Sequence, residues 1–193
     1  MVTNSFSEKV INWYELHGRH DLQWRKAITP YRIWISEIML QQTQVVTVKP
    51  YFKKFIKKYP TLKSIQDASE DEILTLWSGL GFYKRARNIF RTKEIIHSEH
   101  KGRFPKTFKE IIKLPGIGKS TAGAIMSIAH QIPTPILDGN VKRILQRYFS
   151  DGKNIFSEKE LWDLSLSVSN ATNSNLFTQG IMDIGATICT PQN

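Results

Sequence analysis

The sequence predicts an all-α protein made of two helical lobes, and two observations carry this prediction. Capping-box signals, in which a Ser or Thr precedes a Glu by three residues at the start of an apolar run, begin at Ser69, Thr107 and Ser157. No segment offers successive strands joined by hairpin turns. A chain of 193 residues is long enough for one compact domain or for two small lobes that share a core.

In chain order, the first long helical candidate is residues 31–46, YRIWISEIMLQQTQVV, which is apolar on most faces and is therefore expected to be buried. Residues 69–77 (SEDEILTLW) and 107–114 (TFKEIIKL) follow as helices that start at capping boxes. Residues 86–100 place apolar side chains at helical spacing with basic residues between them. Residues 157–168 form the last such segment.

The lobe boundaries are faint in the sequence. Single Pro and Gly residues mark short loops, and there is no tandem repeat or low-complexity tract. We expect one helical lobe over residues 21–133, and a second lobe assembled from residues 1–20 and 134–193.

Charge and cysteine content narrow the class of protein. A net charge of +10 and a pI near 9.7 indicate a polyanionic partner, nucleic acid first and an acidic membrane surface second. The alternative is that the lysines are ordinary solvent-exposed surface residues. The single cysteine, Cys189, excludes an internal disulfide framework and fits a reducing compartment. Neither a signal peptide nor a membrane-spanning stretch is visible, so we expect a cytoplasmic protein that does not enter a membrane.

The stretch GIGKST, residues 116–121, resembles the end of a phosphate-binding P-loop. The first glycine of that motif would fall at position 113, which is Lys113, and the preceding segment is helical rather than a strand. The nucleotide-binding interpretation therefore fails. Instead, Pro115 ends one helix, Gly116 and Gly118 allow a tight turn, and the next helix begins near Lys119.

This pair of helices joined by a tight turn, over about residues 107–128, has two interpretations. Successive backbone N–H groups at a helix N-terminus suit a single phosphate of a DNA backbone, independently of base sequence. The alternative is a plain αα-hairpin with a glycine turn.

Four motifs extend this picture. LPGIGKSTAGAI, residues 114–125, resembles the helix-hairpin-helix of the base-excision DNA glycosylase superfamily that includes endonuclease III, and ILDGNVKRIL, residues 136–145, resembles its catalytic aspartate segment. SEIMLQQTQV and GLGFYKRARN resemble the adenine DNA glycosylases in particular. The resemblance covers nearly the whole chain. It implies a helix-hairpin-helix glycosylase fold, with a six-helix barrel-type lobe over 21–133 and the active site in the cleft between two lobes.

Two carboxylates fit this chemistry. Glu37 lies among apolar residues, and burial disfavours a charged carboxylate, so Glu37 is a candidate proton donor; the alternative is an acid at an exposed helix edge. Asp138 precedes Gly139 at an expected helix start, where backbone N–H groups favour a negative charge; an ordinary N-cap is the alternative. One protonated and one charged carboxyl group is the arrangement that cleaves glycosidic bonds.

The resemblance assigns roles to individual positions. Glu37 would protonate the adenine ring, Asp138 would stabilise or transiently capture the oxocarbenium-like sugar, and Asn140 would support Asp138 by hydrogen bonding. Gln42 would wedge into the base stack. Phe82 stands where the family usually has a tyrosine that stacks beside the opposing purine; phenylalanine keeps the aromatic face and loses the hydroxyl, so insertion is expected to persist without one hydrogen bond. The substrate-binding positions are Leu22, Trp24, Arg25, Gln42, Thr43, Phe82, Ser120 and Gln179, and the DNA-backbone positions are Gly116, Gly118, Lys119, Lys142 and Arg143.

Ser120 determines the expected reaction subtype. Bifunctional relatives carry a lysine there, whose amine forms a Schiff base with the sugar and leads to strand cleavage. Lys119 lies one residue earlier, about 100° around the helix, and is not expected to substitute. The sequence therefore predicts a monofunctional enzyme that flips out and excises adenine mispaired with 8-oxoguanine or guanine and leaves the strand intact. The alternatives are a thymine- or uracil-mismatch glycosylase of the same superfamily and a DNA-binding module without chemistry.

Basic residues near these motifs suit a DNA channel, namely Lys84, Arg85, Arg87, Lys142, Arg143 and Arg147. KKFIKK, residues 53–58, places lysines four residues apart on a helix, where they repel one another. A bound polyanion would reduce this repulsion, although a solvated face is the more ordinary explanation. We expect a monomer that associates with the bacterial nucleoid through double-stranded DNA.

The resemblance also implies a [4Fe-4S] cluster, for which Cys189 would be the first of four ligands. The other three cysteines are absent from the 193 residues, so this chain by itself does not complete the cluster. The C-terminal domain by which relatives recognise oxidised guanine is absent as well. The chain is therefore expected to be either a fragment or a form without the cluster.

Overall fold

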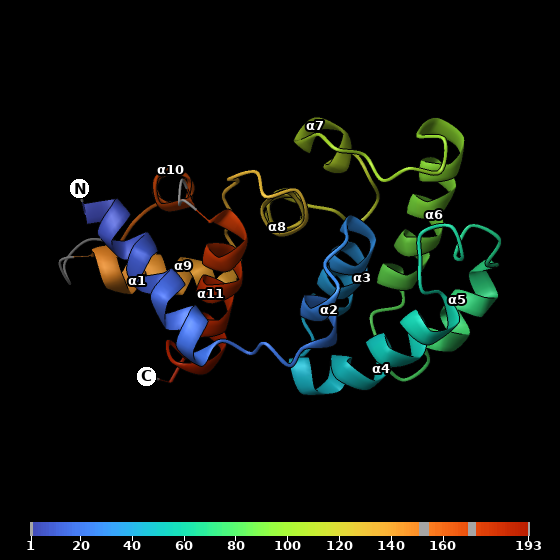
Figure 1. Cartoon of the computed structure of the whole chain (residues 1–193), viewed down its shortest axis with the longest axis horizontal. Coiled ribbons are helices and arrows are strands. Elements are labelled where there is room, and N and C mark those ends of the chain that lie inside the picture. Colours follow the sequence, from blue (N-terminus) through green and yellow to red (C-terminus); the bar gives the residue numbers. More distant parts are fainter. Residues whose placement is uncertain (1, 151–154, 170–172, 193) are drawn as a thin grey trace. The chain divides into compact units, whose positions relative to one another are not determined.

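The computed structural model describes residues 2–150, 155–169 and 173–192. These residues form helices and turns without any strand, which confirms the predicted all-α class (Figure 1). The helices are α1 Val2–His17, α2 Gln23–Lys26, α3 Pro30–Leu40, α4 Val45–Lys58, α5 Glu70–Trp77, α6 Lys84–Glu99, α7 Phe108–Ile111, α8 Lys119–Ala129, α9 Gly139–Phe149, α10 Glu158–Ser169 and α11 Ser174–Thr187. Within the described ranges, no helix has the length and apolar character needed to cross a membrane.

The chain divides into two compact units, which we call the central unit, residues 21–122, and the terminal unit, residues 1–20 with 123–193. The boundary falls inside α8, so residues 123–133 lie in the terminal unit, whereas the sequence-based division placed them with the first lobe. The two units are described separately below.

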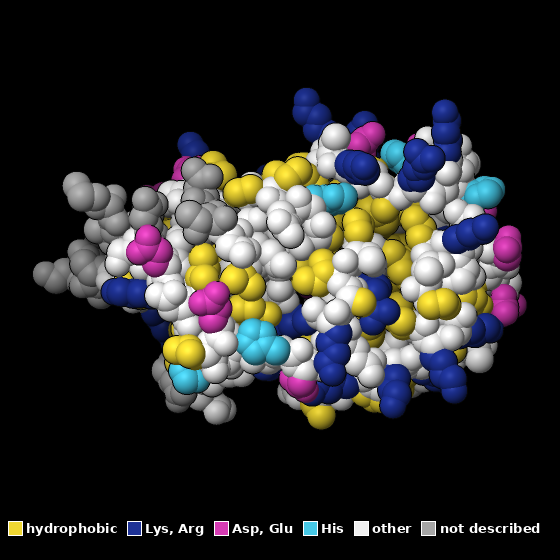
Figure 2. Space-filling model, viewed as in Figure 1, with side chains coloured by type: hydrophobic (Ala, Val, Ile, Leu, Met, Phe, Trp, Pro, Cys, Tyr) yellow, Lys and Arg dark blue, Asp and Glu magenta, His cyan; other side chains and the backbone are white. Residues whose placement is uncertain are grey.

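In the central unit, α3 contacts α4, α4 contacts α5, α5 contacts α6, and α6 returns to α3 (Figure 1). The core between them contains Trp34, Phe52, Phe55 and Trp77, all fully buried. Helix α4 shows why the sequence folds this way, because Val48, Phe52 and Phe55 recur at helical spacing on its buried face. The lysines of residues 53–58 all lie on its exposed face, where dark-blue side chains gather over α4 (Figure 2).

The prediction of one continuous helix over residues 31–46 is wrong in one respect. It is divided into α3, which ends at Leu40, and α4, which begins at Val45. Gln42, between them, has a φ of 55°, a left-handed conformation that a continuous α-helix does not contain. The expected burial of the first part is confirmed, since Ile33, Trp34, Ile35, Ser36, Ile38 and Met39 are all buried.

In the terminal unit, α11 packs against α1 and α9, and α10 contacts all three. Gly180 allows α1 and α11 to approach closely, because a Cβ at this position would lie 3.0 Å from Tyr14 Cβ and from Val10 Cγ1. Arg19, just after α1, donates three hydrogen bonds to the fully buried Asp183 carboxylate of α11 at 2.5 to 2.9 Å. This buried ion pair was not predicted from the sequence.

Candidate functional site

The hairpin that joins α7 to α8 is held against α6. The Thr92 hydroxyl donates to the Pro115 carbonyl at 3.2 Å, and a Cβ at position 116 would lie 2.7 Å from the Asn88 amide nitrogen. Gly116 also has a φ of 79°, which confirms that this turn requires glycine. The same expectation for Gly118 is wrong, because its φ is not positive and a Cβ there would meet no atom within 4 Å.

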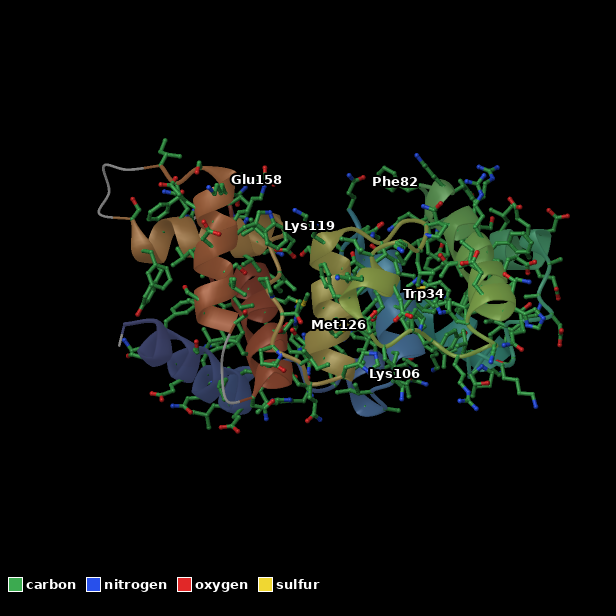
Figure 3. All side chains as sticks on the ribbon, turned by 90° about the horizontal axis from the view of Figure 1, so that it is seen from above. Trp34, Phe82, Lys106, Lys119, Met126 and Glu158 are labelled. Carbon is green, nitrogen blue, oxygen red and sulfur yellow. The ribbon has the colours of Figure 1, made fainter. Side chains whose placement is uncertain are left out.

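The first turn of α8 presents the surface expected to bind a phosphate. Gly116, Gly118 and Lys119 are exposed, and Figure 3 shows Lys119 at the beginning of this helix. The Gly118 carbonyl accepts the Ala122 N–H at 2.9 Å and so starts the helix. Ser120 is half-buried. The glycines of this turn are therefore accessible to solvent.

Gln42 and Phe82 are two of three exposed residues in the central unit that have a rare backbone conformation, and the third is Lys101. Gln42 has a φ of 55° and Phe82 a φ of 49°, and both side chains are exposed, Phe82 by 58% (Figure 3). A bulky non-glycine residue with a positive φ is strained, and such strain persists where the surrounding structure holds it. These are the two residues for which the sequence predicts insertion into the base stack.

The Gln42 turn is connected directly to the hairpin. The Gln41 side-chain amide donates to the Gly116 carbonyl at 3.1 Å and approaches the Thr121 hydroxyl at 3.4 Å. The hydroxyl of Thr43 donates back to the Gln41 carbonyl at 3.3 Å. Two of the predicted DNA-contacting segments therefore share one local network, and Gln41 itself was not singled out from the sequence.

The remaining predicted residues of the central unit differ in exposure. Glu37 is half-buried on α3, where the neighbouring Ser36 and Ile38 are fully buried. Leu22 and Trp24 are buried, and the Trp24 ring contacts Phe52 edge-on with ring centres 5.2 Å apart; Arg25, by contrast, is half-buried. Of this group, Glu37 and Arg25 are the ones whose side chains solvent reaches in part.

In the terminal unit, Asp138 is the N-cap of α9. Its Oδ1 accepts the Val141 N–H at 2.8 Å, as the sequence predicts for a helix start at this position. Gly123 allows α8 to approach the segment that leads to Asp138, because a Cβ there would lie 2.2 Å from the Pro135 carbonyl oxygen. The backbone on both sides of Asp138 is thus held by close packing and by a cap.

Arg143 is held inside the terminal unit. Its guanidinium donates to Asn140 Oδ1 at 2.8 Å and to the carbonyls of Gly185 at 2.7 Å, Cys189 at 2.6 Å and Gly139 at 3.3 Å. These bonds orient the Asn140 amide and hold the end of α11 against α9. The predicted contact of Arg143 with the DNA backbone stays a prediction, but its donors already serve the fold.

Gln179 and Lys142 complete the predicted residues of this unit. Gln179 is buried, and its amide nitrogen donates to Asn175 Oδ1, while its Oε1 has no hydrogen-bond partner among the described residues. A buried amide oxygen without a partner is able to accept a hydrogen bond from a ligand. Lys142 lies on the surface, 3.3 Å from the Glu158 carboxylate.

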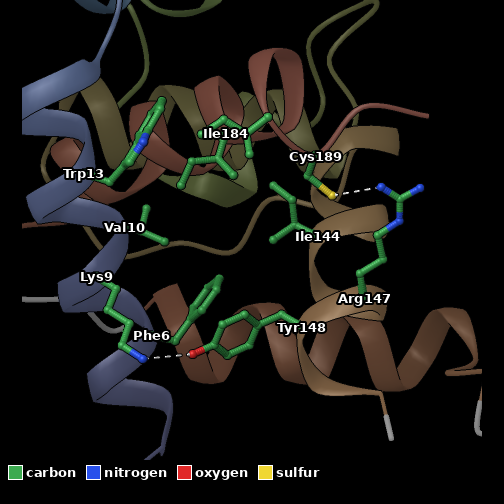
Figure 4. Close-up of a pocket in the computed structure, with 10 residues that line it drawn as sticks. Phe6, Lys9, Val10, Trp13, Ile144, Arg147, Tyr148, Ile184 and Cys189 are labelled. Carbon is green, nitrogen blue, oxygen red and sulfur yellow. Dashed lines mark hydrogen bonds between the residues drawn. The ribbon is translucent and has the colours of Figure 1, made fainter. Parts of the chain in front are cut away.

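Cys189 lies beside an apolar pocket of about 410 Å³ formed by α1, α9 and the end of α11 (Figure 4). Phe6, Trp13 and Ile144 contribute to its lining, and the Cys189 thiol accepts a hydrogen bond from Arg147 at 3.5 Å. Among the described residues, no three His, Cys, Asp or Glu side chains gather as metal ligands. A [4Fe-4S] cluster needs four protein ligands, so the residues described here do not fit one by themselves.

Comparison with known proteins agrees with this arrangement. Residues 35–165 match the HhH-GPD superfamily of base excision DNA repair proteins. The adenine DNA glycosylase of Buchnera aphidicola subsp. Schizaphis graminum is 52% identical over 193 residues, which cover 97% of this chain and 55% of the relative. The chain therefore spans about half the length of the curated relatives it matches.

Solved structures show the same fold. A thermostable thymine-DNA glycosylase has a TM-score of 0.88 and 29% identity, covering 99% of this chain and 89% of its own. A non-covalent endonuclease III–DNA complex has a TM-score of 0.80 and 20% identity, covering 98% and 86%, and this likeness supports the fold alone. The resemblance that the four sequence motifs indicate is confirmed.

Proposed function

Because the chain belongs to the HhH-GPD superfamily of base excision DNA repair proteins, we propose that it excises adenine from double-stranded DNA where adenine is mispaired with 8-oxoguanine or guanine. The observation that carries this proposal is the 52% identity to an adenine DNA glycosylase over nearly the whole chain. The exposed hairpin turn and the exposed Gln42 and Phe82 side chains support a DNA-binding role for the central unit.

The reaction divides between two carboxyl groups. Glu37 donates a proton to the adenine ring, so that the base leaves as a neutral molecule when the N-glycosidic bond breaks. The Asp138 carboxylate stabilises the positive charge that develops on the sugar. Water then adds to the anomeric carbon and releases a proton. The half-buried position of Glu37 on a buried helix and the N-cap position of Asp138 support these roles.

Recognition of the base involves the terminal unit. A flipped-out adenine carries an exocyclic amine that donates hydrogen bonds, and the buried Oε1 of Gln179 is an acceptor without a partner among the described residues. We expect this oxygen to bind the adenine amine. Thymine has no exocyclic amine, so it does not make this contact.

Ser120 makes the proposed enzyme monofunctional. A serine hydroxyl does not form a Schiff base, and Lys119 is exposed on the adjacent position of α8. The product is therefore an abasic site in an intact strand. We further propose that the protein is a monomer in the cytoplasm, associated with the nucleoid through DNA.

A second function is favoured by one observation, the TM-score of 0.88 and 29% identity to a thymine-DNA glycosylase. Single-turnover assays on duplexes with A:8-oxoguanine, A:G, T:G and U:G pairs separate the two candidates. Adenine release from the first two duplexes supports the proposal, and release of only thymine or uracil supports the second candidate.

The assay is read with and without alkali, which cleaves the strand at an abasic site. We expect strand breaks only when alkali treatment follows the enzyme reaction. For Glu37→Gln and Asp138→Asn, in proteins whose circular dichroism matches the unmutated chain, we expect the single-turnover excision rate to fall by about 100-fold or more. Breaks without alkali would refute monofunctional chemistry. DNA binding without release of any base would show a binding module instead.

A further inference from the structure

The two strained residues share a structural cause. Each left-handed residue, Gln42 and Phe82, is preceded by a peptide group whose carbonyl oxygen, that of Gln41 or Gly81, accepts a hydrogen bond from the same side chain, Arg85. The Arg85 Nη1 donates to Gln41 at 2.5 Å, and Nη2 donates to Gly81 at 3.3 Å. One guanidinium therefore contacts both peptide groups whose orientation determines where Gln42 and Phe82 point.

Additional contacts fix the guanidinium itself. Nη1 also donates to the carbonyls of Ile38 and Met39 at the end of α3, at 3.2 and 2.7 Å. The guanidinium carbon lies 5.4 Å from the Trp77 ring centre and 5.2 Å from the Phe82 ring centre, which are stacking distances for a cation on an aromatic face. Arg85 thus holds the Gln41 carbonyl before Gln42 by a hydrogen bond and also packs against the face of the Phe82 ring.

Burial excludes the simpler role of a phosphate contact. Arg85 is only 7% exposed, whereas Arg87, two residues later on α6, is exposed and pairs with Glu70 at 3.3 Å. Burying a guanidinium is costly unless its donors are used. Four carbonyl oxygens accept hydrogen bonds from Nη1 and Nη2 of Arg85, while its Nε has no hydrogen-bond partner among the described residues. A lysine carries the same charge as a single point and does not span two carbonyls as a planar fork does.

We propose that Arg85 is a positioning residue that holds Gln42 and Phe82 in one shared arrangement, ready to enter the DNA base stack together. This inference rests on the proposed function, because it assigns a purpose to the insertion of both side chains. Gln41 extends the arrangement to the hairpin through its bond to Gly116. The wedge, the aromatic side chain and the phosphate-binding turn are then presented to the duplex as one rigid surface, so that little ordering is needed on binding.

The test compares Arg85→Lys with Arg91→Lys, a matched change at an exposed position of the same helix that leaves net charge unaltered. Hydrogen exchange of the free protein is measured for the backbone of residues 40–45 and 79–84. We expect faster exchange in both segments together for Arg85→Lys and no change in either for Arg91→Lys. Exchange that is unaltered, or altered in one segment only, overturns the inference without reference to any activity.

Base flipping gives the second readout. A 2-aminopurine placed next to the target adenine brightens when the neighbouring stack opens. We expect the rate of this signal to fall roughly 10- to 100-fold for Arg85→Lys, with less than about a twofold change for Arg91→Lys. Equal signals for the two variants contradict the inference. Absence of flipping and of base release in the unmutated chain contradicts the proposed function instead, while the exchange experiment still decides the role of Arg85.

Trp77→Phe covers the case in which Arg85→Lys does not fold. The Trp77 Nε1 donates to the same Gly81 carbonyl at 2.9 Å, and phenylalanine retains a ring beneath the guanidinium while removing this bond. We expect faster exchange confined to residues 79–84 and a smaller reduction of the flipping rate. No effect of Trp77→Phe on either measurement contradicts the requirement that the Gly81 peptide be held.

Discussion

Gly185 on α11 lies against Asn140 on α9 so closely that a Cβ at position 185 would come within 2.5 Å of the Asn140 Cβ. The Gly185 carbonyl also accepts a hydrogen bond from Arg143, whose Nη2 holds the Asn140 amide as well. The position of Asn140, two residues after the proposed catalytic Asp138, therefore depends on a glycine more than forty residues away in the sequence.

Gly185→Ala is predicted to displace Asn140, because the added methyl group meets another side chain close to the backbone, where little movement is available. We expect a loss of about 1 to 3 kcal/mol in the free energy of unfolding and a fall of about tenfold or more in the single-turnover rate. Urea denaturation and the excision assay measure the two effects. Ala186→Ser, an exposed position on the same helix, serves as the control and should alter neither.

The hairpin contains two glycines, Gly116 and Gly118, that can be compared directly. Gly116 has a φ of 79° and is crowded by Asn88, whereas Gly118 is neither left-handed nor crowded. Gly116→Ala is predicted to lower stability by about 1 to 2 kcal/mol, the cost of a left-handed alanine, with any clash against Asn88 in addition. Gly118→Ala should cost less than about 0.5 kcal/mol. Equal losses in urea denaturation would show that the turn is governed by something other than backbone conformation.

The buried ion pair of the terminal unit leads to a third prediction. Asp183 is fully buried, and Asp183→Ala removes the carboxylate that accepts hydrogen bonds from the Arg19 guanidinium. We expect the free energy of unfolding to fall by about 3 to 5 kcal/mol, toward the lower end of this range because the Arg19 side chain is 26% exposed. Asp21→Ala, which breaks the exposed pair with Lys49, should lower the stability far less in the same thermal or urea unfolding measurement.

Local signals in the sequence were sufficient for much of the fold. The capping boxes at Ser69 and Ser157 form with both reciprocal hydrogen bonds, and Asp138 caps α9. Such features depend on residues three apart, so the chain order alone reveals them. The break of the 31–46 segment at Gln42 could not be predicted in this way, because the bonds that hold it come from Arg85.

Long-range contacts explain what the sequence analysis missed. Arg85 lies four residues before Ile89, on the buried face of α6, and a basic residue in an apolar register was the available signal that it is not a surface charge. Arg143 and Asp183 likewise bind partners more than forty residues away. Composition and spacing identify such residues as polar or charged, but only the packed helices show which carbonyl or carboxylate they meet.

The capping box of α5 makes stability depend on pH in a defined window. The Ser69 backbone N–H, followed by the Lys58 ammonium at 2.9 Å, lowers the pKa of Glu72 from 4.5 to about 2. A carboxyl group whose pKa is lower in the folded state stabilises the fold above its unfolded pKa, and this contribution disappears as the pH falls through the folded pKa. The stabilisation by Glu72 is therefore complete above about pH 5 and is lost between about pH 4.5 and 2.

Glu72→Gln isolates this effect from other carboxylates, because Glu110 and Glu160 also have lowered pKa values through bonds to Thr107 and Ser157. The difference in free energy of unfolding between the unmutated chain and Glu72→Gln should be constant near neutral pH and shrink steadily below about pH 4.5, when measured by urea denaturation at each pH. Repeating the series at 1 M salt weakens the Lys58 contribution through screening and retains that of the Ser69 N–H. A difference that stays constant down to pH 2.5 would show that the Glu72 carboxylate is not stabilised by its folded-state partners.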